Sequence, residues 1–339
     1  MGTKRILVVG AGFAGAVVAR KLHEAGYDVT VIDRRDHIAG NAYDFQNGFG
    51  IRVHRYGPHL FHTNNEEVFK WLTKFTDWVP YEHHIKAKLK DGTFVTFPVN
   101  RNTLKHVKKD DIFKVFFEPY SKKMWGEYYK ELSKDVFDRV KPRDTNDDRC
   151  FTDEYQYMPV DGYTKMFENI LNGIKVKLST DYHKSMENDY DHIFNSMAID
   201  EYYDYCYGEL PYRSIRFHTH TVPIDEILPC TTVNFTDDNK FTRVTEWKQI
   251  PMHGTNMNYS TVTYEEPCDY KETGEKYYPV ITEKNKELYK KYREIQNDKV
   301  TFIGRCGLYT YMDMHMVISS SLSIAKKFIR ENKYGKEEA

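Results

Sequence analysis

The stretch Lys4-Arg5-Ile6-Leu7-Val8-Val9-Gly10-Ala11-Gly12-Phe13-Ala14-Gly15 decides the fold of this chain. Its apolar run predicts a buried strand, and the three glycines that follow form a GxGxxG pattern. Residues 16–25 have an apolar face at helical spacing, and residues 28–32 predict a second strand that ends at Asp33. Strand, glycine turn, helix, strand and acid follow in the order that a dinucleotide-binding unit requires.

Each part of this unit has a physical role. Gly10 allows a tight turn, Gly12 lets the backbone approach a pyrophosphate, and Gly15 lets helix and strand pack closely. The free N–H groups at the start of the helix, around Phe13 and Ala14, are expected to face the phosphates. Asp33, followed by Arg34, is placed to accept hydrogen bonds from the adenosine ribose.

Two further segments favour FAD over a nicotinamide dinucleotide. Residues 34–42 form a polar loop with a second glycine, Gly40, next to Asn41, where a nicotinamide-binding unit normally continues into a helix. Residues 301–305 predict a strand that ends in Gly-Arg, and a helix is expected from about Met312 to Ile329. We expect Arg305 to neutralise a phosphate and the helix N-terminus to face the isoalloxazine ring, although a surface ion pair is the alternative for Arg305.

Composition excludes several classes of function. The 339 residues are 40% hydrophobic, enough for two or three lobes with buried cores, and the net charge of −1 does not suggest nucleic-acid or membrane binding. The five cysteines show no CxxC pair, so no zinc site or disulfide framework is expected, and a reducing cytoplasm fits. His54, His59 and His62 lack acidic or cysteine partners nearby, so we expect no metal. The apolar run at residues 5–9 is too short for a signal peptide or a membrane span.

The patterns predict an α/β protein: an FAD-binding Rossmann-like domain with a small helical domain and an antiparallel β-sheet substrate domain. The expected organisation is residues 1–78 for the first part of the FAD-binding domain, 79–101 for a hairpin of the sheet domain, 102–138 for the small helical domain, 139–160 for a mobile loop and return, 161–205 for the second FAD-binding part, 206–280 for the antiparallel sheet, and 281–339 for the C-terminal FAD-binding part.

The polar stretch from residue 139 to residue 149 has no apolar period and carries Arg143 near its centre. It is expected to be either a lid over a site or a solvated linker, and few buried contacts should hold it without ligand.

Several motifs together resemble the UDP-galactopyranose mutases, flavoenzymes that interconvert UDP-galactopyranose and UDP-galactofuranose. The resemblance covers nearly the whole chain in the family's order. The motifs that carry it are residues 38–43, 56–64, 120–125, 142–163, 212–214, 233–236, 241–246, 277–280 and 304–314. Competing interpretations are an FAD oxidoreductase of amine-oxidase-like architecture and a non-catalytic nucleotide-sugar binding protein.

The resemblance implies an isomerase that proceeds through a covalent sugar adduct on N5 of reduced flavin, without net redox change. NAD(P)H or another external reductant would supply the electrons. It implies that Arg143 and Arg243 bind the diphosphate and that His59 lies against the flavin near N5. The implied substrate-side residues are Phe116 and Tyr120 around the uracil, Trp125 nearby, Tyr155, Tyr278 and Tyr311 as hydroxyl donors to the diphosphate, Arg213 as a supporting charge, and Asn234 and Asp313.

The implied FAD contacts form one set along the chain. They are Gly10, Gly12, Phe13, Ala14, Gly15, Asp33, Arg34, Gly40, Asn41, Gly57, His59, Leu60, Arg305, Met312, Asp313 and Met314.

Two features depart from the family pattern. Only about 20 residues separate Asn100 from Tyr120, so helices that contribute to the family dimer are missing, and either a homodimer with an altered interface or a monomer is expected. Thr96 stands where the family often has Asn, which is expected to alter sugar or nucleotide contacts. Acceptance of UDP-N-acetylgalactosamine is an open alternative, because no residue we can name forbids it.

Overall fold

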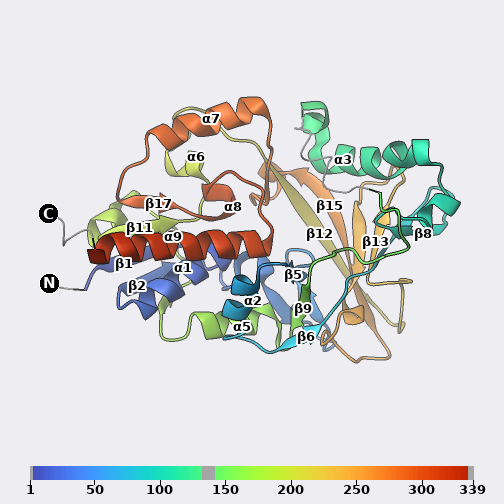
Figure 1. Ribbon diagram of the computed structural model, residues 1–339, viewed down its shortest axis with the longest axis horizontal. Coiled ribbons are helices and arrows are strands. Elements are labelled where there is room, and N and C mark those ends of the chain that lie inside the picture. The colour runs from blue at the N-terminus through green and yellow to red at the C-terminus, as the bar shows by residue number, and fades with distance from the viewer. Residues whose placement is uncertain (1–2, 132–141, 335–339) are drawn as a thin grey trace.

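The computed structural model describes residues 3–131 and 142–334 (Figure 1). The expected helical domain and loop therefore extend partly outside the described residues, at positions 132–141. One layer is a five-stranded parallel sheet, as the β-α-β pattern predicts. In spatial order its strands are β10 (Lys175–Lys177), β2 (Asp28–Ile32), β1 (Arg5–Val9), β11 (His192–Asn195) and β17 (Val300–Phe302).

Helices cover both faces of this sheet (Figure 1). Helices α1 (Phe13–Glu24), α9 (Met314–Tyr334) and α5 (Gly162–Ile170) pack on the face of β1 that carries Ile6 and Val8. Helices α6 (Ile199–Tyr202) and α7 (Glu283–Glu294) pack on the face that carries Leu7 and Val9. Successive side chains of β1 therefore enter two different cores, which is why the strand is apolar without interruption.

The second layer is a seven-stranded sheet. Its strands, in spatial order, are β16 (Tyr278–Pro279), β12 (Tyr212–Val222), β15 (Ser260–Asp269), β14 (Arg243–Glu246), β13 (Thr232–Phe235), β7 (Ile85–Lys88) and β8 (Phe94–Phe97). The sheet is antiparallel as expected, except that the β7–β8 hairpin joins it through a parallel pairing of β7 with β13. The hairpin from residues 79–101 thus extends a sheet whose other strands come from residues 212–279.

Between the two layers lie smaller elements. These are the strand pair β3 (Asp44–Gln46) and β4 (Arg52–His54), the three-stranded sheet β5 (Phe61–Thr63), β9 (Tyr155–Pro159) and β6 (Trp78–Pro80), and helix α2 (Glu66–Leu72). Helix α2 is capped by Asn65, whose side chain accepts a hydrogen bond from the Val68 backbone N–H at 3.1 Å.

A short helical segment packs at the far end of the second sheet (Figure 1). It consists of the 3₁₀ turns Thr103–Lys105 and Lys109–Asp111, a π-helical turn Phe113–Phe117, helix α3 (Glu118–Trp125) and a 3₁₀ turn Gly126–Glu131. Within the described residues, no helix is long and apolar enough to cross a membrane. The same part of the chain contains no group of three or more His, Cys, Asp or Glu side chains that could hold a metal ion.

Candidate active site

A cavity of about 480 Å³ opens where three strands of the parallel sheet end. Gly10 follows β1, Asp33 follows β2 and Ser196 follows β11, and all three line it. This is the edge at which open α/β sheets bind ligands. Helix α1 starts here with no side-chain cap and no acidic residue in its first turn, so its N–H groups are available to an anion.

The glycines fit a pyrophosphate that lies directly on the backbone. Gly10 has φ = +101°, and a Cβ at this position would lie 2.0 Å from Oγ of Ser196. A Cβ on Gly40 would lie 2.8 Å from the Cα of Gly12, so the two glycine turns approach each other closely. A Cβ on Gly15 would lie 1.8 Å from the Gly10 carbonyl oxygen, which confirms its predicted packing role.

Most of the expected FAD contacts lie around this one cavity. Those that line it are Gly10, Gly12, Phe13, Ala14, Asp33, Arg34, Gly40, Asn41, His59, Arg305, Met312 and Met314. Gly15, Gly57, Leu60 and Asp313 do not line it. Leu60 packs on the core beside α1, and Asp313 directly precedes α9.

Asp33 is held in place by the backbone. Its Oδ2 accepts a hydrogen bond from the Ala11 N–H at 2.7 Å, and its Oδ1 accepts one from the Arg35 N–H at 2.9 Å. Arg34 pairs with Glu275 at 3.0 Å, so a loop from the second half of the chain closes over this end of the cavity. The carboxylate is thereby fixed at the cavity wall, where a ribose would lie.

His59 marks the opposite end of the cavity. Its Nδ1 lies 2.9 Å from the Gly57 carbonyl oxygen, and its backbone N–H donates to Nδ1 of His54 at 3.1 Å. Burial lowers the pKa of His59 to about 4, and the positive charges of Arg305 and Arg243 act in the same direction. The ring is therefore neutral near pH 7.

Arg305 differs from the expectation of a phosphate ligand. Its Nη1 donates to the Tyr277 carbonyl at 2.9 Å and its Nη2 to the Met312 carbonyl at 2.6 Å. The guanidinium carbon lies 5.1 Å from the ring centroid of Tyr278 and 5.2 Å from that of Tyr311. Arg305 thus joins two segments of backbone and holds the two tyrosines, because both of its terminal nitrogens are engaged.

Beyond His59, one face of the second sheet forms the next part of the site. Arg243 lies opposite Asn234 on β13 and opposite Glu265 on β15, and Glu265 lies opposite Phe217 on β12. Directly paired residues point to the same face, so all four share it. Thr96 pairs with Lys86, one residue out of step, and therefore lies on the opposite face. The expected effect of Thr96 on sugar contacts is not supported, because a single step along a strand reverses the face.

Arg243 is anchored at one atom and open at the others. Its Nε donates to Oε1 of Glu265 at 2.7 Å, and the Glu265 side chain is only 2% exposed. Within the described residues, neither terminal nitrogen of Arg243 has a hydrogen-bonding partner, and 32% of its side chain is exposed. Burial opposes the charge of Arg243, but Glu265 raises the net pKa above its ordinary value. The free side of the fork is suited to phosphate oxygens.

Tyr278 and Tyr311 stack beside this arginine, with ring centroids 6.1 Å apart and an interplanar angle of 17°. Burial raises the pKa of Tyr278, so its hydroxyl stays protonated and can donate a hydrogen bond. Two of the three expected diphosphate tyrosines, Tyr278 and Tyr311, are therefore brought together next to Arg243.

The residues expected around the base separate into buried and open positions. Phe116 is 5% exposed and packs on Phe97 at 5.8 Å, and Trp125 is 7% exposed. Tyr120 is 38% exposed, and its hydroxyl acts electrostatically on Arg243. Phe116 belongs to the core under the helical segment, and the sandwich of the uracil between Phe116 and Tyr120 stays a prediction.

Arg213 is also used differently from the expectation. Its Nε donates to the Met124 carbonyl at 2.7 Å and its Nη2 to the Lys123 carbonyl at 3.3 Å. These carbonyls lie at the C-terminal end of α3, where a positive charge is favourable. Arg213 therefore fixes the helix that carries Tyr120 to the sheet that carries Arg243.

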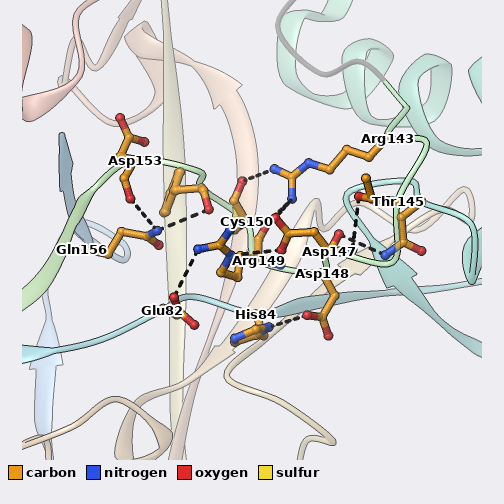
Figure 2. Close-up of polar contacts among 12 residues, drawn as sticks. Glu82, His84, Arg143, Thr145, Asp147, Asp148, Arg149, Cys150, Asp153 and Gln156 are labelled. Carbon is orange, nitrogen blue, oxygen red and sulfur yellow. Dashed lines mark hydrogen bonds and ion pairs between the residues drawn. The ribbon is translucent and has the colours of Figure 1, made fainter. Parts of the chain in front are cut away.

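Arg143 folds back onto its own loop (Figure 2). Its Nη1 donates to the Arg149 carbonyl, and its Nη2 donates to the Cys150 carbonyl at 3.2 Å. The loop is tied to its neighbours as well: Arg149 pairs with Asp147 at 3.0 Å and with Glu82 at 3.3 Å. None of residues 142–150 is buried, so the expectation of few buried contacts is confirmed for this part of the loop, and polar contacts near the surface hold it instead.

Tyr155 does not join the diphosphate residues. It begins β9 and stacks on Phe69 of α2, with ring centroids 4.4 Å apart. Since it pairs with Thr63 of β5, its ring belongs to the small sheet between the layers. Its expected hydroxyl contact to the diphosphate stays a prediction.

Sequence reasoning missed three residues at the site. Glu265 is the partner of Arg243, and no motif marked it. His83 is 4% exposed, and burial together with Arg243 lowers its pKa to about 3. The Cys150 backbone N–H donates to the His83 carbonyl at 2.6 Å. Burial raises the pKa of the Cys150 thiol, and the charges of Arg243 and Arg143 oppose that rise. The alternation that continues from Ile85 back to His83 was the one available signal.

Comparisons with known proteins agree with the fold. The family model for UDP-galactopyranose mutase matches residues 115–311, and that for an NAD(P)-binding Rossmann-like domain matches residues 8–75. The dTDP-fucopyranose mutase of Escherichia coli is 33% identical, over 97% of this chain and 99% of that protein. A probable UDP-galactopyranose mutase of Klebsiella pneumoniae is also 33% identical, over 97% of this chain and 96% of that protein.

Among solved structures, that of a reduced UDP-galactopyranose mutase superimposes with a TM-score of 0.76, over 97% of this chain and 95% of the other, at 15% identity. This similarity shows a shared fold.

Proposed function

Because the chain belongs to the UDP-galactopyranose mutase family, we propose that it is a flavin-dependent isomerase that interconverts UDP-galactopyranose and UDP-galactofuranose. FAD would occupy the cavity at the ends of β1, β2 and β11. Its pyrophosphate would lie at Gly10 and Gly12, its ribose at Asp33 and its flavin end at His59.

One observation carries the proposal: Glu265 connects Arg243 to the flavin-side loop, which is residues 56–64. Its Oε1 bonds to Nε of Arg243 and also lies 3.5 Å from the place of a Cβ on Gly57. A diphosphate on the free side of Arg243 therefore lies one residue away from the loop that carries His59. The anomeric carbon is bonded directly to that diphosphate, so the sugar would lie between Arg243 and the flavin end.

The protein groups around such a substrate have distinct tasks. Arg243, Tyr278 and Tyr311 would bind the diphosphate oxygens and stabilise the charge that develops as UDP leaves. Arg143 would exchange its two backbone carbonyls for a phosphate, and Tyr120 would contact the uracil. When bound and reduced by an external donor such as NAD(P)H, FAD would supply the nucleophile for the anomeric carbon, with no net redox change.

The deciding experiment is anaerobic incubation of the dithionite-reduced protein with UDP-galactofuranose, followed by chromatography of the nucleotide sugars. We expect UDP-galactopyranose to form only with reduced protein. An oxidised sugar product would support the amine-oxidase-like alternative. Tight UDP-sugar binding without turnover by the reduced protein would support the non-catalytic alternative.

A second candidate substrate follows from the comparison with the Escherichia coli dTDP-fucopyranose mutase, which is as similar to this chain as the Klebsiella protein. Fucose lacks the 6-hydroxyl of galactose, and thymine carries a methyl group that uracil lacks. Ratios of kcat/KM for UDP-galactofuranose and the dTDP-fucose isomer, measured under the same conditions, decide between them. UDP-N-acetylgalactosamine belongs in the same assay.

A further inference from the structure

Two buried histidines connect the flavin-side loop to the second sheet. His54 ends β4, and His253 lies in the loop between β14 and β15. Each is 1% exposed, and their Nε2 atoms are 2.9 Å apart. The backbone joins the same segments, because the Arg52 N–H donates to the His253 carbonyl at 2.7 Å.

The neighbours of this pair define the proton on each ring. Nδ1 of His253 lies 2.9 Å from the Pro251 carbonyl oxygen, which only accepts, so this nitrogen carries the proton. Nε2 of His253 is then an acceptor and must receive the proton of His54 Nε2. That leaves Nδ1 of His54 as an acceptor, as the His59 N–H that points to it at 3.1 Å requires. One chain of donors therefore runs from His59 through His54 and His253 to Pro251.

This chain of hydrogen bonds fixes the orientation of the peptide group between Pro58 and His59. If the peptide between Pro58 and His59 turned its carbonyl toward His54, Nδ1 of His54 would need a proton. Nε2 of His54 would then have to accept, and His253 would have to move its own proton away from the Pro251 carbonyl. A reversal at His59 therefore leaves an unsatisfied buried group at Pro251.

We propose that His54 and His253 act as a positioning pair, which holds the Pro58–His59 peptide and the His59 ring in one orientation toward the bound flavin. The proposal rests on the proposed function, because it assumes that FAD occupies the cavity that His59 lines. Neither His54 nor His253 lines that cavity. They act through the His59 backbone and touch neither cofactor nor substrate.

The surroundings keep both rings neutral. Burial lowers the pKa of His54 well below its ordinary value and that of His253 to about 4. Arg52 disfavours a charge on either ring, and Asp44 favours one on His253. The rings of Trp247 and Tyr163 enclose the His54 ring, with centroids 4.9 Å and 5.7 Å from its own.

The first test examines the wild-type protein with bound FAD by ¹⁵N NMR of its histidine side chains at pH 7. We expect His54 to carry its proton on Nε2 and His253 on Nδ1, both in slow exchange. The opposite tautomers, or an imidazolium on either ring, would overturn the proposal. This measurement needs no turnover, so it is independent of the substrate assay.

The second test compares His253→Gln with His253→Leu. Glutamine can accept from His54 and donate to the Pro251 carbonyl, whereas leucine leaves the His54 proton without an acceptor. We expect kcat of the leucine variant to fall by about tenfold or more, with KM for the nucleotide sugar nearly unchanged, since a misplaced reacting group lowers the rate. The flavin midpoint potential should shift in the leucine variant and return toward the wild-type value in the glutamine variant.

A matched control is His192→Leu. His192 lies in β11, remote from His59, and burial also lowers its pKa to about 4. Its Nε2 lies 2.9 Å from Oγ1 of Thr301 in β17. Equal kcat and equal flavin potential in His253→Leu and His192→Leu would show that His253 is merely structural. Loss of FAD binding by the wild-type protein would instead contradict the proposed function.

Discussion

At the scale of single residues, the arginines of this site are distinguished by what already occupies them. Arg213 and Arg305 donate to backbone carbonyls and hold the scaffold together. Arg143 does the same within its own loop. Arg243 alone among these four donates a hydrogen bond to a carboxylate within the described residues, where its terminal nitrogens are open.

We expect Arg243→Ala to lower turnover by about 10²–10³-fold, or about 3–4 kcal/mol, because a charge-assisted contact to the leaving diphosphate is lost. Arg143→Ala should have a similar effect. FAD should stay bound in both variants, since neither arginine lines the FAD cavity. Anaerobic turnover and the flavin spectrum measure the two properties.

The matched control is Arg216→Ala. Arg216 is an exposed arginine on β12, and it pairs with Glu272. It should keep wild-type turnover. If Arg143→Ala or Arg243→Ala retains half of the wild-type rate at saturating substrate, the role assigned to that arginine is wrong.

At the scale of elements, the loop at residues 139–149 has two alternative sets of partners, its present protein contacts and a bound diphosphate. In its described part, the Arg143 N–H donates to the Val99 carbonyl at 2.8 Å. Asp147 pairs with Arg149 in the same part of the loop (Figure 2). Residues 139–141, including the possible cleavage site Arg139, lie outside the described residues. A diphosphate would offer Arg143 an anion in place of neutral carbonyls, and this favours a second arrangement.

We predict that UDP protects the loop from trypsin at Arg143 and Arg149. Binding of Arg143 to the diphosphate should order the loop around the ligand and exclude the protease. Mass spectrometry of the fragments over time measures the cleavage at each site. Arg143→Ala should weaken the protection at Arg149, even at UDP concentrations that saturate the variant.

Asp147→Asn offers a second handle on the same loop. Bonding to Arg149 lowers the pKa of Asp147 to about 2, so the carboxylate is charged at neutral pH, and the amide would weaken this tie. Cleavage without ligand should accelerate, while UDP protection persists. Equal cleavage of the wild-type protein with and without saturating UDP would remove the loop from the mechanism and favour a rigid linker.

At the scale of the whole molecule, the two sheets divide the work. The parallel sheet provides the dinucleotide cavity at its strand ends, and one face of the seven-stranded sheet provides Arg243 and Asn234. We therefore predict a yellow protein that holds FAD without a covalent bond. Heat denaturation should release intact FAD into the supernatant, as chromatography would show. Release of NADP, or a flavin that stays with the precipitate, would contradict this.

Stability should depend on pH through the buried neutral histidines. Burial lowers the pKa of His59, His192 and His253 to about 4, whereas an unfolded histidine titrates near 6.5. Between these values the unfolded chain binds more protons, so the free energy of unfolding should fall as pH drops from about 6.5 to about 4. Each independent histidine can contribute up to about 3 kcal/mol.

Urea unfolding of the protein with bound FAD at pH 7, 6 and 5 measures this effect. His192→Gln should reduce the slope, because it removes one titrating group far from the FAD cavity. If the free energy of unfolding is constant or rises toward pH 5, the buried histidines do not control the pH dependence of stability.

The sequence by itself determined the dinucleotide-binding unit and the order of the two lobes. Residues 4–33 predicted strand, turn, helix and strand correctly, because local apolar periodicity and the glycine positions encode them directly. The same stretch located the cavity, since Gly10 and Asp33 follow adjacent parallel strands. The family motifs also identified Arg243, Tyr278 and Tyr311, which the structure brings together.

Only the tertiary structure decided the partners of those residues. Glu265 meets Arg243 because β14 and β15 pair in one particular register, and β7 joins β13 in parallel without any local sign. The side of the sheet for Thr96, the stacking of Tyr155 on Phe69, and the carbonyls held by Arg213 and Arg305 likewise depend on segments distant in sequence. Alternation along a strand fixes which residues share a face, but the choice of neighbouring strand and register arises from packing of the whole chain.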